Sequence, residues 1–476
     1  MWLEMKLIFQ PLRWAWLMGI VLAGCSQVPK LPDARTPTIE RFRQAPSDRG
    51  ASTLSDAHLA SRVPLDWWAS MNDPTLNALQ HQLTLGSPSL QVLAAQTRQA
   101  QAALVGAQAS LWPSLNLNTG VTRSANQLAA VQGTSYSLSA PLSWQIDLWG
   151  QLDAQVQAAL SSLEATREDW AAGRRAAQST LVQTYVSLRT AERQLDALQR
   201  AEQAYQKSLD LTLARHQAGV ASGSDVELAR NQWASTQAQR LDMATQVAQL
   251  QHAIAVLVGQ APVDLKVAPL DAPALQSAPA EPPELPAEIP ANLLEQRPDL
   301  QAAKRRFESA NAQIGVAQAA FFPTVNFNMA AGYRSRELSN LVTSGNQFWS
   351  VGPGLALNLF DFGLRRAARD QAVAARDVAL ANYRQAVLNA YQQVEDNLVA
   401  VVQLKQQQEA QRQAWDAARR NLALTQAQYV AGTVSYLNVV TAQTAALTAE
   451  RAWLDVQSRR WLATNSLMAE IGRAHV

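Results

Sequence analysis

Two periods of apolar side chains alternate along this chain. Apolar positions recur every three to four residues in a segment at 75–110 and in two longer segments at 151–218 and 364–431. This spacing is typical of amphipathic helices. Asp73 before Pro74 predicts the N-cap of the first helix, and the turn residues Gly86-Ser87-Pro88 break that helix. At 1.5 Å per residue, each of the two longer segments predicts a helical rod about 100 Å long.

A period of two predicts four strands, in which apolar side chains alternate with Asn, Ser, Thr and Gly. They lie near 114–123, 135–146, 324–334 and 348–359. At about ten to thirteen residues, each matches a tilted membrane-spanning strand. Aromatic residues mark the strand ends, as in interfacial girdles; these are Trp112, Trp144, Trp149, Phe321, Phe322, Trp349, Phe360 and Phe362. The alternative is a pair of soluble hairpins whose aromatic side chains pack on a helix.

The chain contains the same unit twice. Residues 111–118 match 321–328 at an offset of 210, and 146–150 match 359–363 at an offset of 213. A proline-rich linker separates the copies and carries nine of the 21 prolines, too many for a helix or sheet to continue. The predicted organisation is repeat 1 at 66–259, the linker at 260–298 and repeat 2 at 299–472.

A glycine ends each long rod at equivalent points of the two copies, Gly219 and Gly432. A glycine just past a helix supplies a left-handed cap, and helical periodicity resumes at 225–257 and 437–468. Each copy therefore predicts a helical hairpin with its tip far from the strands. The tips, with Val220 and Thr433 next to the glycines, are the predicted docking points for a partner.

Four strands cannot close on themselves. An open sheet in lipid leaves backbone donors and acceptors unpaired, at several kcal/mol each, so other chains must complete it. Closed membrane barrels start at about eight strands. A cyclic homo-oligomer follows, because each copy would supply the same four strands.

Composition narrows the function classes. Charged residues make up 16% of the chain, the net charge is +2, and no basic block predicts nucleic-acid binding. The single cysteine excludes an intrachain disulfide. No nucleophile elbow, phosphate loop or metal-ligand spacing is present, so no enzyme activity, metal or cofactor is expected. The histidines are scattered, at His58, His81, His216, His252 and His475.

The N-terminus predicts export. Basic residues precede the apolar run 15–23, which is too short to span a membrane and is typical of a signal peptide at 1–24. Leu22-Ala23-Gly24-Cys25 resembles a bacterial lipobox, with cleavage between Gly24 and Cys25. That resemblance implies a lipid, such as palmitate, on Cys25, and Ser26 after it implies release to the outer membrane. A lipidated arm at 25–65 follows. The alternative is an ordinary secretory signal with a chance cysteine.

Several motifs together resemble the TolC-like outer-membrane factors, in their lipoprotein (NodT-type) branch. The most specific match runs through 289–300 and 310–323, with the core sequences Gln296-Arg297-Pro298-Asp299-Leu300 and Ala310-Asn311-Ala312-Gln313-Ile314-Gly315. Trp144-Gln145-Ile146-Asp147-Leu148-Trp149-Gly150 and Leu65-Asp66-Trp67-Trp68 also match. The resemblance covers residues 25 to 472.

This resemblance implies an α+β membrane protein that forms a homotrimer. Its twelve-stranded barrel would lie in the outer membrane, above a periplasmic α-helical tunnel. The tips would meet a periplasmic adaptor and an inner-membrane pump of the RND type. Leu437 would lie at the tunnel aperture. Thr441 departs from the family, because many relatives carry Asp there, which leaves a cation site at the tip in doubt.

The function that follows is passive conduction of small molecules out of the cell, with energy from the pump. Two alternatives remain open from the sequence, a type I protein secretion duct and a non-conducting scaffold lipoprotein. The transported substrate cannot be read from the chain.

Overall fold

The computed structural model describes residues 28–32, 66–126, 131–271, 281–282 and 296–471. The predicted cleavage and lipidation site at Gly24 and Cys25 lies outside these ranges. The chain divides into two compact units, which cut across the predicted repeats. Unit 1 comprises residues 1–36, 95–168 and 301–386, and unit 2 comprises residues 37–94, 169–300 and 387–476.

The described elements follow one another in a repeating order. They are η1 (Trp67–Met71), α3 (Pro74–Gly86), α4 (Pro88–Ala109), β1 (Ser114–Leu115), β2 (Asn118–Asn126), β3 (Val131–Ile146), α5 (Gln151–Gln217), α6 (Gly223–Val258), α8 (Pro298–Ala319), β4 (Thr324–Ser335), η3 (Leu338–Asn340), η4 (Ser344–Asn346), β5 (Gln347–Ala356), α9 (Leu364–Val430) and α10 (Tyr436–Ile471).

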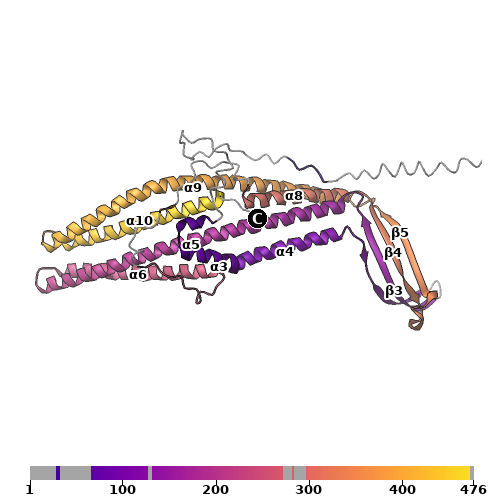
Figure 1. Ribbon diagram of the computed structural model, residues 1–476, viewed down its shortest axis with the longest axis horizontal. Helices are drawn as coiled ribbons and strands as arrows, with labels where there is room; N and C mark the ends of the chain where they lie inside the picture. The colour runs from indigo at the N-terminus through magenta and orange to yellow at the C-terminus, as the bar shows by residue number, and fades with distance from the viewer. Residues whose placement is uncertain (1–27, 33–65, 127–130, 272–280, 283–295, 472–476) are drawn as a thin grey trace, which may run out of the picture. The chain divides into compact units, whose positions relative to one another are not determined.

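The duplication predicted from sequence is confirmed by element lengths. Helices α5 and α9 have 67 residues each, α6 and α10 have 36 each, and α4 and α8 have 22 each. In unit 2, α6 runs back beside α5 and α10 runs back beside α9 (Figure 1). Each copy therefore carries the helical hairpin that the glycines predict.

Unit 1 contains an antiparallel sheet in the order β1/β2-β3-β4-β5 (Figure 1). β1 and β2 pair with β3 in one continuous register, in which Ser114 faces Ser143 and Asn118 faces Ser139. The ladder is interrupted opposite Pro141, which accepts a hydrogen bond from the Asn116 N–H at 3.0 Å but has no N–H to return. β1 and β2 are therefore one strand, and the four-strand prediction is confirmed.

Three strand ends differ from the prediction. β2 continues to Asn126 rather than near 123, because Asn126 pairs with Val131 of β3. β3 begins at Val131 rather than near 135, because polar and glycine residues there hide the alternation that a strand would show. β5 ends at Ala356 rather than near 359, because its partner β4 begins at Thr324, which pairs with Ala356. Pro323 precedes β4 and cannot donate to a ladder, so the residues beyond Ala356 find no strand to pair with.

The core of unit 2 lies where α3, α5, α6 and α10 meet. Its largest fully buried side chains include Leu76, Leu83, Leu181, Tyr185 and Ile254. The N-cap predicted at Asp73 is confirmed, since its carboxylate accepts the N–H groups of Thr75 and Leu76 at the start of α3. This cap fixes where the short helix enters the core.

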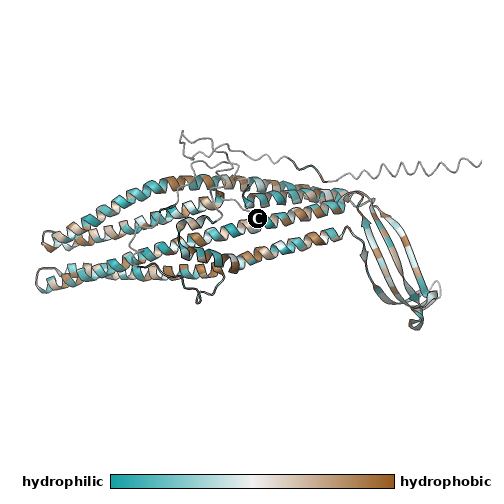
Figure 2. Cartoon of the chain, in the orientation of Figure 1, coloured by the Kyte–Doolittle hydropathy of each residue, from teal (hydrophilic) through white to brown (hydrophobic). Residues whose placement is uncertain are grey.

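Hydrophilic and hydrophobic stretches alternate along the long helices (Figure 2). No helix in the described ranges has both the length and the hydropathy of a membrane-crossing segment.

Two glycines with the same left-handed backbone provide a matched test of packing. Gly259 (φ +77°) lies so close to Gly86 that an added Cβ would come within 2.1 Å of the Gly86 carbonyl oxygen, whereas Gly219 (φ +76°) has open space around it. We expect Gly219→Ala to cost about 1–2 kcal/mol from backbone strain alone. Gly259→Ala should lower the thermal midpoint of the detergent-purified protein more than Gly219→Ala does, because its Cβ would also collide with the Gly86 carbonyl oxygen. Equal shifts would show that the contact with Gly86 does not matter.

Candidate functional site

The hairpin tips are closed by the same capping motif in both copies. In the first, the Val220 N–H donates to the Arg215 carbonyl at 2.8 Å and the Gly219 N–H donates to the His216 carbonyl at 2.9 Å. In the second, Thr433 and Gly432 make the equivalent bonds at 3.0 Å each, to Gln428 and Tyr429. These pairs define Schellman caps, which need a left-handed residue at the glycine. All four residues predicted at the tips lie in the turns.

A small apolar cluster joins the two hairpins just behind their tips. Buried side chains from α5, α6, α9 and α10 form it, namely Leu209, Val226, Ala229, Tyr429, Tyr436 and Val439. Arg215 links the hairpins directly, because its Nη1 donates to the Tyr429 carbonyl at 2.9 Å. Its guanidinium also lies 4.6 Å from the Tyr429 ring centroid, a cation–π contact. Sequence reasoning did not identify Arg215, because no pattern pairs it with α9.

Leu437 and Thr441 lie one turn apart on the exposed face of α10. Leu437 is 55% exposed, although the neighbouring Tyr436 is buried. The Thr441 hydroxyl donates to the Leu437 carbonyl at 2.9 Å, so it is bonded within its own helix. The structure thus brings both predicted aperture residues to one face, with a methyl-bearing side chain instead of an acid at residue 441.

The sheet of unit 1 has one apolar and one polar face. Its register aligns apolar side chains in rows across all four strands, one of which contains Leu115, Leu142, Met329 and Val351. An adjacent row on the opposite face contains Ser114, Ser143, Asn328 and Gly352. On the apolar face Leu115 is 69% exposed and Val351 52% exposed. Exposed apolar rows of this kind mark a contact with lipid or with another chain.

Aromatic side chains gather where the strands meet the helices. Trp149 stacks on Phe322 with ring centroids 5.0 Å apart, and its indole N–H donates to the Pro323 carbonyl at 2.7 Å. Trp112 and Phe362 remain largely exposed. A ring with one polar and one apolar side suits the interface between lipid and water.

Both outer strands of the sheet have one free edge within the described residues. β1 and β2 pair only with β3, and β5 pairs only with β4. The backbone donors and acceptors along these two edges are available for other strands.

The sequence model of a known family covers most of this chain. The family described as outer membrane efflux protein matches residues 79–260 and 289–473. The chain belongs to this family. Its members act as channels, so the expectation of a non-enzymatic transport protein is confirmed.

Individual efflux proteins resemble the chain over nearly its full length. The toluene efflux pump outer membrane protein TtgF of Pseudomonas putida is 29% identical over 449 residues, which is 92% of this chain and 91% of the relative. Outer membrane protein OprJ of Pseudomonas aeruginosa is 28% identical over 469 residues, 96% of this chain and 95% of the relative.

Solved channels share the fold. The outer-membrane channel OprN matches with a TM-score of 0.81 and 28% identity, over 93% of this chain and 98% of that chain. The CmeC outer membrane channel of Campylobacter jejuni matches with a TM-score of 0.82 over 94% of this chain and 95% of that chain, at 22% identity, which supports the fold alone.

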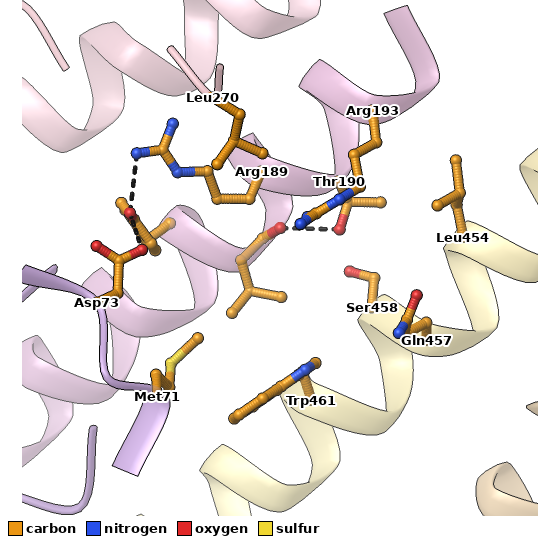
Figure 3. Close-up of a pocket in the computed structure, with 12 residues that line it drawn as sticks. Met71, Asp73, Arg189, Thr190, Arg193, Leu270, Leu454, Gln457, Ser458 and Trp461 are labelled. Carbon is orange, nitrogen blue, oxygen red and sulfur yellow. Dashed lines mark hydrogen bonds between the residues drawn. The ribbon is translucent and has the colours of Figure 1, made fainter. Parts of the chain in front are cut away.

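In this efflux family member a polar network links α3 to α5. The Tyr185 hydroxyl donates to Asp73 and accepts from Arg189 Nη2 at 2.9 Å; burial and the bond to Asp73 raise the pKa of Tyr185 above its ordinary range. Beside this network lies a cavity of about 120 Å³. Figure 3 shows Thr190 and Arg193 facing Ser458 across it. With Asp73 also capping α3, the network has a structural role.

The Arg-Pro-Asp motif of the sequence match holds a second polar cluster. Arg297 is nearly buried and forms two bonds to Asp299, at 3.1 and 2.8 Å, and one to Gln393 at 3.0 Å. A second cavity is lined by Arg297, Asp299, Gln393 and Glu470. The Glu470 carboxylate accepts a hydrogen bond from the Asn397 side chain at 3.1 Å. Burial is the main cause that raises the pKa of the Glu470 carboxyl to about 6, while Arg297 opposes the rise.

Among the described residues, no three His, Cys, Asp or Glu side chains are grouped so that they could share a metal ion.

The raised pKa of Glu470 predicts how stability depends on pH. The folded state holds this proton more tightly than the unfolded state, so the stability it contributes is present below pH 4.5 and is lost as pH rises through about 6. Glu470→Gln should therefore raise the thermal midpoint at pH 7.5 and flatten its fall between pH 4.5 and 7. Asp455→Asn, at a carboxylate paired with Arg459 on the exposed surface, is the control. An unchanged pH profile in Glu470→Gln would contradict the assignment.

Proposed function

We propose that this chain forms the exit duct of a tripartite efflux system in the outer membrane, as a homotrimer that conducts small molecules passively. The observation that carries the proposal is the sheet of unit 1, which exposes apolar rows and leaves both edges unpaired in a chain of the efflux family. In lipid such edges require partner strands. Three copies supply twelve strands, above the roughly eight that a closed membrane barrel needs.

The surface of α9 supports assembly through helices as well. Only seven of its 67 residues are buried in a single chain. Its exposed apolar side chains include Leu388, Val399, Val402 and Leu424. At 100° per residue these four lie within about 60° of one another, as one stripe. A second copy of the chain would cover this stripe, and the α9 helices would then help to wall a tunnel.

Gating is proposed at the hairpin tips. Adaptor and pump would bind there, and their contacts would favour an open arrangement of the hairpins over a closed one. The contact of Arg215 with Tyr429 would hold the hairpins of one chain together in the closed arrangement. Leu437 would narrow the aperture by its apolar side chain, since Thr441 supplies no charge. An RND pump is the proposed source of energy.

Lipidation of Cys25 is the proposed second attachment to the membrane. The lipobox-like Leu22-Ala23-Gly24-Cys25 supports it. Each buried methylene contributes about 0.8 kcal/mol, so several acyl chains on one residue would bind a bilayer stably. The strands of the trimer would span the bilayer independently of this anchor.

A chemical susceptibility panel tests the efflux function. A strain lacking this gene is compared with its complemented parent on dyes, detergents, several antibiotic classes and transition metals. Hypersensitivity that complementation restores is expected and would identify the cargo. No difference across the panel, together with proteins missing from the culture supernatant, would favour a protein secretion duct; conductance absent from planar bilayers would favour a scaffold.

A charge at the proposed aperture should loosen its closed state. In Leu437→Asp, three carboxylates would face one another where apolar side chains met before, and like charges repel. We expect a higher single-channel conductance and entry of vancomycin into cells. Val256→Asp, at a similarly exposed position of α6, is the control. Conductance and vancomycin entry that match the wild type in Leu437→Asp would remove Leu437 from the aperture.

Loss of the lipid should leave the trimer insertable. Cys25→Ser removes the acylation site, and mass spectrometry of the mature chain should show no fatty acid. Membrane fractionation should still recover the protein in the outer membrane, because the strands provide the span. A variant that is entirely soluble in the periplasm would show that the lipid, rather than the sheet, supplies the attachment.

A further inference from the structure

A short N-terminal segment, residues 28–32, is packed against α8 in unit 1. The Asn311 side chain donates from Nδ2 to the Pro29 carbonyl at 2.8 Å. Asn311 is only 3% exposed. Among the described residues its Oδ1 atom has no hydrogen-bond partner. A buried amide group without hydrogen bonds is costly. Because the Oδ1 atom has no partner among the described residues, the bond from Nδ2 to the Pro29 carbonyl is the main hydrogen bond of this side chain.

One helical turn further along α8, Gly315 leaves the space that the segment occupies. A Cβ at Gly315 would lie 2.9 Å from Val28 Cγ2, 3.1 Å from Val28 Cα and 3.2 Å from the Cβ of Ala154. Glycine inside a helix costs about 1 kcal/mol relative to alanine. The close approach of Val28 and Ala154 provides a reason for its presence. Residues four apart share one helix face, so Asn311 and Gly315 act on the same segment.

Both residues belong to the Ala310-Asn311-Ala312-Gln313-Ile314-Gly315 sequence of the family-like motif. The aperture, the sheet edges and the tips lie elsewhere in the chain. Asn311 and Gly315 contact the N-terminal segment, and Gly315 also leaves room for Ala154 of α5. The motif therefore has a local task at this point of α8, which is to receive the N-terminal segment.

We propose that Asn311 and Gly315 form a docking site for the chain's own N-terminal arm, and that this site fixes where the acylated N-terminus meets the membrane. The second part rests on the proposed lipidation. Cys25 is three residues before Val28, and a chain spans at most about 3.6 Å per residue. A lipid on Cys25 would therefore be tethered within about 11 Å of the docked Val28.

The docking site lies close to the base of the sheet. α8 ends at Ala319, four residues after Gly315, which is about 6 Å along the helix. β4 begins at Thr324. Phe322 lies between α8 and β4, and Trp149 stacks on it. An acyl chain on Cys25 can therefore enter the bilayer beside the aromatic residues at the base of the strands. The docked arm would then hold the lipid anchor at the same depth in the membrane as the base of the sheet.

Trypsin cleavage after Lys30 measures docking directly, because Lys30 is exposed and a protease needs the segment to leave α8. The test uses the full-length protein purified in mild detergent, with release of the N-terminal peptide followed by mass spectrometry. Gly315→Ala should be cut about tenfold faster than the wild type. Asn311→Ala, which adds no atoms, should be cut about fivefold faster through loss of one hydrogen bond.

Gly106→Ala is the matched control, because Gly106 also lies inside a helix of unit 1 and an added Cβ there meets nothing within 4 Å. It should be cut at the wild-type rate. Thermal midpoints of all variants are measured alongside, so that general unfolding is recognised. Equal cleavage rates in the wild type, Gly315→Ala and Asn311→Ala, with the proteins folded, would overturn the proposal.

Cys25→Ser separates docking from lipidation. If the site on α8 holds the arm, Lys30 stays protected in Cys25→Ser. Cleavage that accelerates in this variant, with Asn311 and Gly315 intact, would show that the lipid holds the arm and would contradict the docking site. A wild-type mature chain without a fatty acid, but with Lys30 protected, would refute the lipidation and leave the docking site standing.

Discussion

Backbone hydrogen bonding at the edges of a four-stranded sheet is the constraint on which the rest of this structure depends. The sheet exposes apolar rows such as Leu115 and Val351, which suit lipid, yet lipid offers no hydrogen-bond partner for the free edges of β1/β2 and β5. A single chain cannot satisfy both conditions. Assembly with other copies resolves the conflict, because each added copy supplies an edge strand to its neighbours.

The long helices extend each chain beyond the sheet. α5 and α9 run for 67 residues each without a proline, so each can act as a continuous rod. Each rod ends at a glycine cap, formed at Gly219 and Gly432. Apolar clusters and an ion pair between Arg200 and Glu450 join the hairpins along much of their length. The cluster nearest the tips has Arg215 and Tyr429 at its edge.

Sequence periodicity predicted the repeated elements because each depends on local rules. The glycine caps at Gly219 and Gly432 and the N-cap at Asp73 were predicted for this reason, as were the four strands. Long-range partners could not be predicted in the same way. Nothing in the sequence pairs Arg215 with Tyr429, Arg297 with Gln393, or Asn311 with Pro29, since such contacts depend on how distant segments meet. The interruption of the first strand is an intermediate case: Pro141 is visible in the sequence, but the break appears in the partner strand, whose register only the structure gives.

The most direct test of assembly through the sheet edges is the number of chains in the particle extracted from the outer membrane in mild detergent, measured by native mass spectrometry. Three copies are expected, held together by the sheet edges and separating into single chains when heated. A folded particle that contains one copy, with its strand content intact by circular dichroism, would contradict the claim that the sheet requires other chains.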